Sequence, residues 1–283
     1  MQNARIMNHN KQIISGLSHE QYEHPFDQKA LQTLEKPLVG LIPNPIPIVG
    51  EWITSNFIER IFNVQYTGSN LRVTKDNYPN IHEYLEYACK ILNVEKVPEL
   101  YIQWGYNINA FTVGAENPII VLNSGMIDLC DEDEILFIIG HELGHIKSNH
   151  MLYHMMAQYL NELVGIMGPI ANMVTVGVQY AIYYWYRMSE FTADRAGLMC
   201  CQNQDAVIMA FMKMAGMPQT HFNEMNKSAF IQQARDFKQL DTESMNKLIK
   251  IVSIANDTHP WTVMRAAELL KWIDKGEYNK FVK

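Results

Sequence analysis

A short motif, His-Glu-Leu-Gly-His at positions 141–145, constrains the fold of this chain more than any other feature. On an α-helix, residues four apart lie on one face, so His141 and His145 can offer imidazole nitrogens to a single metal ion. Glu142 lies beside that face, where its carboxylate can accept a proton from a metal-bound water without coordinating the ion. The motif therefore predicts a helix that carries two ligands of a zinc site and a general base.

The residues before the motif favour a buried helix. Acidic side chains at residues 131–134 suit a helix N-terminus, and the apolar run 135–139 follows directly. Polar side chains on so apolar a helix need partners, because burial of unpaired polar groups is costly. Core hydrogen bonds could satisfy the two histidines, but they would leave the buried carboxylate of Glu142 unexplained.

Composition limits the class of protein. With 283 residues, 48% of them hydrophobic, the chain can build the core of one large domain or two small ones. Its net charge of -7, with only 23 Lys and Arg, argues against nucleic-acid binding, which requires clustered basic side chains. The cysteines show no C-x-x-C spacing, and residues 1–15 lack the apolar core of a secretory signal. We therefore expect a cytoplasmic protein.

We interpret residues 1–64 as an N-terminal extension and residues 65–283 as the main, metal-binding domain. Residues 37–50 combine apolar side chains with prolines, which disfavour helices and interior strands, so we expect an extended strap that packs across the domain. The strap could instead cover the active-site groove or lie on a membrane. An amphipathic helix is predicted over residues 51–64.

Short strands are predicted at residues 98–104, 109–114 and 118–123, directly before the motif helix. The fold class is therefore α+β, mostly helical, with a small sheet beside that helix. If residues 109–114 form an edge strand, their unpaired backbone groups can hold an extended peptide over the metal. The candidate substrate-binding residues are Asn109, Ala110 and Phe111. An interior strand that only supports the helix fits the sequence equally well.

A zinc site of this kind requires a third protein ligand. The metzincin arrangement would need a histidine where the chain has Met151, so that class is excluded. His150 and His154 lie off the metal-facing side of the helix, and we interpret them as surface or core histidines. Glu162 follows too closely on a continuing helix to fold back onto the site.

Glu190 satisfies the geometric requirement for the third ligand. The chain between His145 and Glu190 is apolar, and its strong helix breaker lies near the midpoint, at Gly168 and Pro169. Two helical arms of about 30 Å each, at 1.5 Å per residue, would return Glu190 to the level of His145. Asp194 lies one helical turn further on, where its carboxylate can accept the outer N–H of a ligand histidine.

Residues 163–186 contain no charged side chain, and an apolar stretch of this length is typical of a transmembrane helix. A single crossing, however, would put His145 and Glu190 on opposite sides of the membrane, where they could not share an ion. A helical hairpin that dips into a bilayer, or that packs within the protein or a homo-oligomer, avoids this conflict. Peripheral membrane contact and homo-oligomerisation therefore both stay open.

Over about residues 65–275 the chain resembles the M48 family of zinc metallopeptidases. The segments that carry the resemblance are His141 to Ile146, Asn109 to Phe111, Ser124-Gly125-Met126, Ser189-Glu190 with Ala193-Asp194, and Thr258-His259-Pro260 with Arg265. The chain departs from many relatives because it lacks clear, long membrane spans.

The resemblance implies a gluzincin endopeptidase with assigned site residues. The implied zinc ligands are His141, His145 and Glu190, with Glu142 as the general base and Asp194 behind the ligands. By the same resemblance, His259 would stabilise the transition state or act as a fourth, inhibitory ligand.

We therefore predict zinc-dependent hydrolysis of peptide bonds in polypeptide substrates. Glu142 would carry the proton of the attacking water to the leaving amine, and His259 or Arg265 would stabilise the oxyanion. The alternative is a latent or non-catalytic, chaperone-like quality-control protein that binds unfolded or membrane-associated polypeptides. Glu142 argues against a closed structural zinc site, which has no use for a base.

Overall fold

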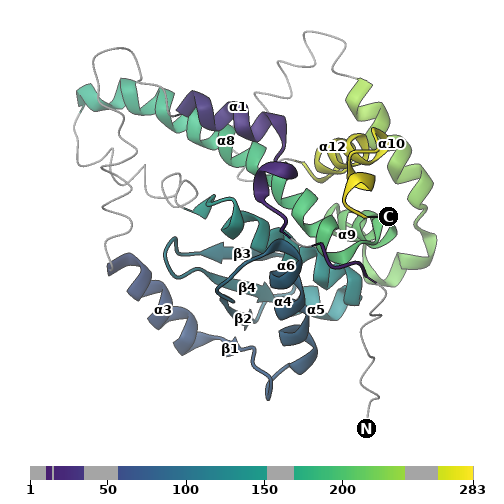
Figure 1. Cartoon of the computed structure of the whole chain (residues 1–283), viewed down its shortest axis with the longest axis horizontal. Helices are drawn as coiled ribbons and strands as arrows, with labels where there is room; N and C mark the ends of the chain where they lie inside the picture. The colour runs from purple at the N-terminus through teal and green to yellow at the C-terminus, as the bar shows by residue number, and fades with distance from the viewer. Residues whose placement is uncertain (1–10, 15, 35–56, 152–168, 240–260, 283) are drawn as a thin grey trace.

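The computed structural model describes residues 11–14, 16–34, 57–151, 169–239 and 261–282, to which all structural statements below refer (Figure 1). Helices predominate and a small sheet lies among them, so the predicted α+β, mostly helical fold class is confirmed. In chain order the elements are η1 (His19–Gln21), α1 (Pro25–Leu34), α3 (Phe57–Ser69), β1 (Leu71–Arg72), α4 (Pro79–Leu92), β2 (Glu99–Gln103), β3 (Ala110–Val113), β4 (Ile119–Asn123), α5 (Ser124–Leu129), α6 (Glu132–Lys147), α8 (Pro169–Cys201), α9 (Gln204–Met214), η3 (Gln219–Glu224), α10 (Lys227–Gln239), α12 (Thr262–Asp274) and η5 (Tyr278–Lys280).

The described strands form one mixed sheet in the order β1-β2-β4-β3. β2 and β4 are parallel, whereas β1 and β3 pair antiparallel with their neighbours. The predicted strands at 98–104, 109–114 and 118–123 correspond to β2, β3 and β4. All of β4 is buried, as expected for a strand with neighbours on both sides. β3 lies at an edge of this sheet, so the structure shows the edge-strand alternative.

Alternate residues of the strands face two apolar layers, because successive side chains point to opposite sides of a sheet. One face contributes to the main core, together with α4 and α6. Its buried strand residues are Leu100, Ile102, Ile120 and Leu122. The other face packs against Tyr66 of α3 in a smaller cluster. Its buried residues are Tyr101, Ile119 and Val121. The motif helix α6 thus rests on the inner face of the sheet.

α6 begins where the sequence predicts. The Asp131 carboxylate accepts a hydrogen bond from the Glu134 N–H at 3.0 Å, and the Glu134 carboxylate accepts one from the Asp131 N–H at 2.7 Å. This capping box satisfies N–H groups that have no partner within the helix. Lys213 of α9 donates to the same buried Glu134 carboxylate at 2.6 Å. The N-terminus of α6 is therefore tied both to its own first turn and to α9.

Small residues let α6 and α8 approach each other closely. A Cβ atom added at Gly144 would lie 2.7 Å from the Cβ of Ala196, and one at Gly140 would lie 2.7 Å from the side chain of Cys200. Such distances are below van der Waals contact, so larger residues would push the two backbones apart. This close crossing brings the motif to the level of Glu190.

The helical hairpin differs from its prediction in the first arm. α8 begins at Pro169, where the turn was expected, but α6 ends at Lys147, because Asn149 takes a left-handed backbone conformation with φ 56°. The rest of that arm, residues 152–168, lies outside the described residues. In the part of the chain that the structure describes, we find no helix that is both long and apolar enough to cross a membrane.

The described N-terminal residues 11–34 pack onto the rest of the molecule. Leu17 and Tyr22 belong to the main core. Arg195 of α8 donates hydrogen bonds to the carbonyls of Tyr22 and Glu23 at 3.0 and 2.9 Å. α1 then runs alongside α8 (Figure 1). This segment therefore shares one core with the domain that follows it.

The rest of the predicted N-terminal extension is described only in part. The strap at residues 37–50 lies outside the described residues. The helix predicted over residues 51–64 corresponds to α3, which the structure describes from Phe57 and which continues to Ser69. The division of the chain at residues 64 and 65 stays a prediction.

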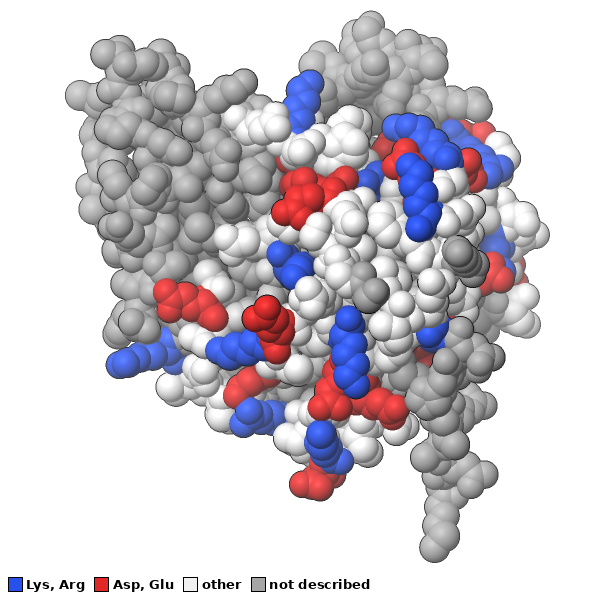
Figure 2. All heavy atoms as spheres, viewed as in Figure 1, with Lys and Arg blue, Asp and Glu red and all other residues white. Residues whose placement is uncertain are grey.

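Charged side chains are interspersed on the face of the molecule that Figure 2 shows. Blue Lys and Arg and red Asp and Glu lie next to one another there, without a large area of a single sign among the described residues. Among the described residues, Arg72 and Glu99 form an exposed ion pair. The exclusion of nucleic-acid binding stays a prediction from composition.

Candidate metal centre

α6 and α8 bring both motif histidines and Glu190 together in the interior. Nε2 of His141 lies 3.1 Å from Nε2 of His145. The Glu190 carboxylate completes the cluster, with Oε1 3.3 Å from Nε2 of His145 and Oε2 3.5 Å from Nε2 of His141. All three side chains are buried, and their candidate ligand atoms lie within 4.8 Å of one another. The three predicted ligands therefore converge on one point.

The separations in this cluster suit a tetrahedral zinc ion. Zinc lies about 2.0–2.1 Å from histidine nitrogen and carboxylate oxygen, and tetrahedral angles then separate neighbouring ligand atoms by about 3.3–3.4 Å. The two Nε2 atoms lie 3.1 Å apart, and they lie 3.3 and 3.5 Å from the two different oxygens of Glu190, distances that are close to this value. Two imidazoles and a carboxylate also leave a fourth position for water or substrate. The residues present thus fit zinc.

The outer nitrogen of His141 contacts the carboxylate of Asp194, the residue predicted to lie behind the ligands. Asp194 Oδ1 lies 3.0 Å from Nδ1 of His141, an arrangement that orients the other nitrogen, Nε2, toward the cluster. Burial opposes a positive charge on His141, but hydrogen bonds to Asp194 and Glu190 outweigh it and raise the pKa of His141 to about 9. Burial lowers the pKa of His145 to about 4, although Glu190 acts in the other direction.

Arg265 of α12 lies against the same carboxylates. Its Nε donates to Asp194 Oδ2 at 2.9 Å, and its Nη2 donates to Asp194 Oδ1. Its Nη1 lies 3.3 Å from Glu190 Oε2. Burial disfavours the guanidinium charge, but the two carboxylates raise the pKa of Arg265 above its ordinary value. These contacts make Arg265 a partner of Asp194 and Glu190, and its predicted role at an oxyanion stays a prediction.

Thr112 of β3 holds the candidate general base. Its hydroxyl donates to Oε2 of the buried Glu142 at 2.7 Å. Thr112 was not among the predicted site residues, although strand alternation is a usable signal, because Thr112 and Ala110 lie on the same face of β3. The sheet therefore fixes the orientation of a carboxylate that α6 supplies.

A cavity of about 190 Å³ opens onto the cluster. Its lining includes His141, Glu142, Glu190 and Arg265, together with Asn109 and Ala110 at the start of β3. Phe111 lies elsewhere, with its ring centroid 5.9 Å from that of Tyr66. Two of the predicted substrate-binding residues therefore border the same cavity as the candidate ligands, and the third packs on the opposite side of the strand.

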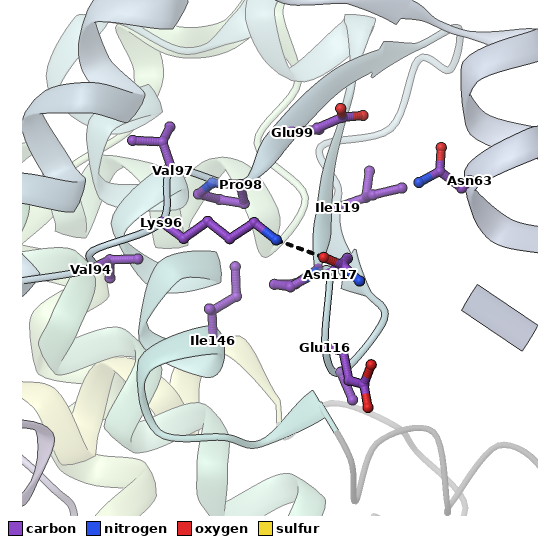
Figure 3. Close-up of a pocket in the computed structure, with 12 residues that line it drawn as sticks. Asn63, Val94, Lys96, Val97, Pro98, Glu99, Glu116, Asn117, Ile119 and Ile146 are labelled. Atoms are coloured by element: carbon purple, nitrogen blue, oxygen red, sulfur yellow. Dashed lines mark hydrogen bonds between the residues drawn. The ribbon is translucent and has the colours of Figure 1, made fainter. Parts of the chain in front are cut away.

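A larger cavity, of about 340 Å³, lies at the other end of the sheet (Figure 3). The figure shows Lys96 reaching across it to Asn117, and its Nζ donates to Asn117 Oδ1 at 2.6 Å. Its described lining includes Ile146, at the end of α6, but none of the predicted site residues. Among the described residues, the predicted site residues that line a cavity therefore lie at the smaller one.

The structure describes only one of two further candidate histidines, His150 and His259. His150, interpreted as a surface or core histidine, is buried, and its Nδ1 lies 3.0 Å from Nδ1 of His145. Asn149 at the left-handed position that ends a helix is a sequence signal that could have indicated this return toward the motif. His259 lies outside the described residues, so its predicted role stays a prediction.

The fold and the cluster together define a class of protein. A buried His-His-Glu cluster with a glutamate beside it, on a mostly helical fold with a small sheet, is typical of zincin-like metallopeptidases. The model of a protein family described as Peptidase family M48 matches residues 76–273. The chain therefore belongs to peptidase family M48. The predicted resemblance is confirmed, and polypeptides are the substrate class of such a metalloprotease.

Relatives with protease names support the same assignment. The chain is 28% identical to the plastoglobule-localized metallopeptidase 48, chloroplastic, of Arabidopsis thaliana over 273 residues, which are 96% of this chain and 77% of that protein. It is 26% identical to a protease HtpX homolog of Salinibacter ruber over 188 residues, 59% of this chain and 64% of that protein. The match to a protease HtpX homolog of Fusobacterium nucleatum is 24% over 139 residues, 48% of this chain and 44% of that protein. The chain thus covers less than two thirds of either HtpX homolog. No solved structure matches it significantly.

Proposed function

We propose that this chain is a zinc-dependent endopeptidase in which His141, His145 and Glu190 bind the ion. One observation carries the proposal. The candidate ligand atoms lie within 4.8 Å of one another in the interior, and the cavity that opens onto them also contains Glu142. A structural zinc site would be closed by a fourth protein ligand and would not need a neighbouring base.

Glu142 is the general base in this proposal. Zinc, when bound, supplies a Lewis acid that lowers the pKa of water to about 7 and polarises the scissile carbonyl. The Thr112 hydroxyl, 2.7 Å from Glu142 Oε2, holds the carboxylate in one orientation. Glu142 accepts the proton of the attacking water and passes it to the leaving amine.

The edge strand β3 binds substrate in this proposal. Asn109 and Ala110 line the cavity, and Phe111 follows them on the strand. An extended peptide that pairs with the outer edge of β3 would lie beside His141 and Glu142, held by backbone hydrogen bonds. Such recognition depends little on side chains, which explains the lack of a specificity motif in the sequence.

The remaining site residues orient or assist this machinery. Asp194 holds the outer nitrogen of His141, and the contacts of Arg265 favour a role in holding the Asp194 and Glu190 carboxylates. His259 is proposed to stabilise the transition state or to act as a fourth, inhibitory ligand.

We further propose a cytoplasmic enzyme that associates with a membrane surface. The support is indirect: the uncharged residues 163–186, and a relative whose name calls it plastoglobule-localized. Homo-oligomerisation through the same segment is compatible with this proposal, as is a division of the chain into an N-terminal extension, residues 1–64, and a peptidase domain, residues 65–283.

Metal analysis of purified protein, with casein cleavage measured in parallel, tests the proposed function. We expect one zinc per chain in the wild type, and loss of both zinc and cleavage in Glu190→Ala. Zinc without cleavage would instead favour the latent or quality-control alternative. The absence of zinc from protein purified without chelators would contradict the proposal.

A further inference from the structure

The outer nitrogen of His145 faces a second histidine rather than a carboxylate. Nδ1 of His145 lies 3.0 Å from Nδ1 of His150. The end of α6 explains this contact. Because Asn149 is left-handed, the N–H of His150 donates to the carbonyl of His145 at 2.9 Å, and that of Asn149 to the carbonyl of Ile146 at 3.1 Å. This Schellman motif folds His150 back over the last turn of the helix.

A carboxylate from the N-terminal segment holds the other side of His150. Asp27, in the first turn of α1, places Oδ2 3.1 Å from Nε2 of His150. The same oxygen accepts a hydrogen bond from the Thr192 hydroxyl of α8 at 2.6 Å. His150 is 2% exposed and Asp27 is 1% exposed. The contacts from His145 through His150 to Asp27 therefore lie wholly in the interior.

Donors and acceptors along these contacts have one consistent arrangement when His145 binds a metal. If Nε2 of His145 is the ligand atom, its proton is on Nδ1, and this N–H donates to Nδ1 of His150. His150 then carries its own proton on Nε2 and donates it to Asp27. The carboxylate accepts from both His150 and Thr192, as an acceptor-only group can. Asp27 therefore selects, through His150, the tautomer of His145 that metal binding requires.

We propose that Asp27 is a positioning residue of the metal centre that acts on the ligand His145 through His150. The inference rests on the proposed function, since it takes His145 to be a zinc ligand. It gives the N-terminal segment a role at the site, although Asp27 lies outside residues 76–273, which the family model matches.

The charge state of Asp27 suits this role. Burial alone would raise the pKa of its carboxyl, but the interactions with His150 and Thr192 outweigh burial and lower it. Asp27 also lies in the first turn of α1, where the helix dipole favours a negative charge. A buried ionic contact is a weak source of net stability, so orientation of the two imidazoles is the stronger reason for it.

The zinc affinity of full-length variants, measured by competition with a chromogenic chelator, tests the proposal. In Asp27→Ala we expect the dissociation constant to rise by about 10–100-fold, as for other residues that orient a ligand histidine. Asp27→Asn should be intermediate, because its amide oxygen still accepts the N–H of His150. Glu23→Gln is the matched control. It removes a nearby charge that interacts with Asp27 and His150 through space, and it should bind zinc like the wild type.

The Co²⁺-substituted protein provides a readout that a change in stability alone does not move. Its visible absorption reports the geometry of the ligand atoms, and we expect the bands to change in Asp27→Ala but not in Glu23→Gln. The ring centroids of His150 and Trp185 lie 5.2 Å apart. His150→Phe keeps an aromatic ring at this position and removes both ring nitrogens. Asp27 and His150 act through one series of contacts. The double variant Asp27→Ala/His150→Phe should therefore bind zinc no more weakly than whichever single variant binds it more weakly.

Unchanged zinc affinity and an unchanged Co²⁺ spectrum in folded Asp27→Ala would overturn the inference and leave the proposed function intact. Equal weakening in Asp27→Ala and Glu23→Gln would also overturn it, because loss of charge would then explain the effect. If Asp27→Ala does not fold, Asp27→Asn and His150→Phe decide by the same criteria. A wild-type protein without zinc would overturn both the inference and the proposed function.

Discussion

The two ligand histidines of the candidate metal centre are supported in different ways. The outer nitrogen of His141 contacts the Asp194 carboxylate directly, and Arg265 holds that carboxylate with two hydrogen bonds. The outer nitrogen of His145 contacts an imidazole, His150, and reaches the Asp27 carboxylate only through it. Both arrangements end in a buried carboxylate. Asp194 is paired with the positive charge of Arg265, whereas Asp27 contacts His150 and Thr192, and the two carboxylates come from different segments.

The two sides of the candidate site also draw on different parts of the chain. Asp194 and Arg265 lie within residues 76–273, which the family model matches, and Asp194 follows Glu190 at helical spacing. Asp27 comes from α1, before the matched region. The residues behind His141 therefore lie within the region that the family model matches, whereas Asp27, behind His145 and His150, comes from outside it.

The substitution Glu142→Gln should have the largest effect, because it removes the general base and leaves the residues behind both ligand histidines in place. Glu142→Gln keeps the shape of the side chain and can still accept the hydrogen bond from Thr112, but it cannot take up a proton. We expect turnover of casein to fall roughly 10²–10⁴-fold, the usual contribution of a general base. Zinc content, measured by metal analysis, should not change. Substantial activity in this variant would remove Glu142 from the proposed mechanism.

Arg265→Met removes the guanidinium that holds the Asp194 carboxylate behind His141. It leaves the buried carboxylates of Asp194 and Glu190 without their guanidinium partner, so we expect the metal-free protein to lose about 3–5 kcal/mol of unfolding free energy in urea denaturation. Bound zinc should restore part of this loss, because the ion supplies positive charge.

Arg235→Met provides the control for this variant. Arg235 and Asp274 form an exposed ion pair at 3.6 Å, and such pairs contribute little to stability. Equal destabilisation by the two substitutions would contradict the structural role of Arg265.

The pH dependence of zinc binding should sharpen the comparison. The pKa of His141 is raised to about 9, so a proton competes with zinc for this ligand at neutral pH. The apparent zinc affinity should therefore rise with pH, by up to about tenfold per pH unit, and level off above pH 9. His145 contributes nothing in this window, because its pKa is lowered to about 4. Competition titrations at several pH values measure the slope, and a flat profile would contradict the assignment.

Thr112→Val should have the smallest effect. It removes the hydroxyl that donates to Glu142 and leaves both histidine supports in place. Loss of one hydrogen bond to a charged group corresponds to about 1.5 kcal/mol, so we expect roughly a tenfold fall in casein turnover with unchanged zinc affinity. Thr112→Ser keeps the hydroxyl and should retain activity. Weakened zinc binding in Thr112→Val would mean that β3 supports the ligands and not the base.

The sequence predicted the strands and the start of the motif helix well. β2, β3 and β4 lie within one residue of their predicted ends, because alternation of apolar side chains is a local signal. The position of Gly168 and Pro169 predicted a return of the chain to Glu190, which the structure places beside both histidines, although α6 ends at Lys147 and does not continue into the first arm.

Thr112, His150 and Asp27 could not be assigned in the same way. Thr112 reaches Glu142 only because β3 is laid against α6, and strand pairing has no fixed spacing in the chain. His150 depends on one left-handed residue, Asn149, which turns a position off the metal-facing side back toward His145. The sequence after residue 147 is compatible with a continuing helix, so it does not predict that His150 folds back toward His145.

By itself, the sequence determined the parts of this protein that depend on short, regular spacing. These parts are the His-Glu-Leu-Gly-His helix, the carboxylates of Glu190 and Asp194 one turn apart, and the strands before the motif. Only the tertiary structure decided that Arg265 lies against Asp194 and that Asp27 contacts His150 behind His145. Arg265 and Asp27 arrive from opposite ends of the chain, and their contacts follow from the packing of α12 and α1 around α8. No local periodicity encodes such contacts, because they are set by the burial of distant helix faces in a common core.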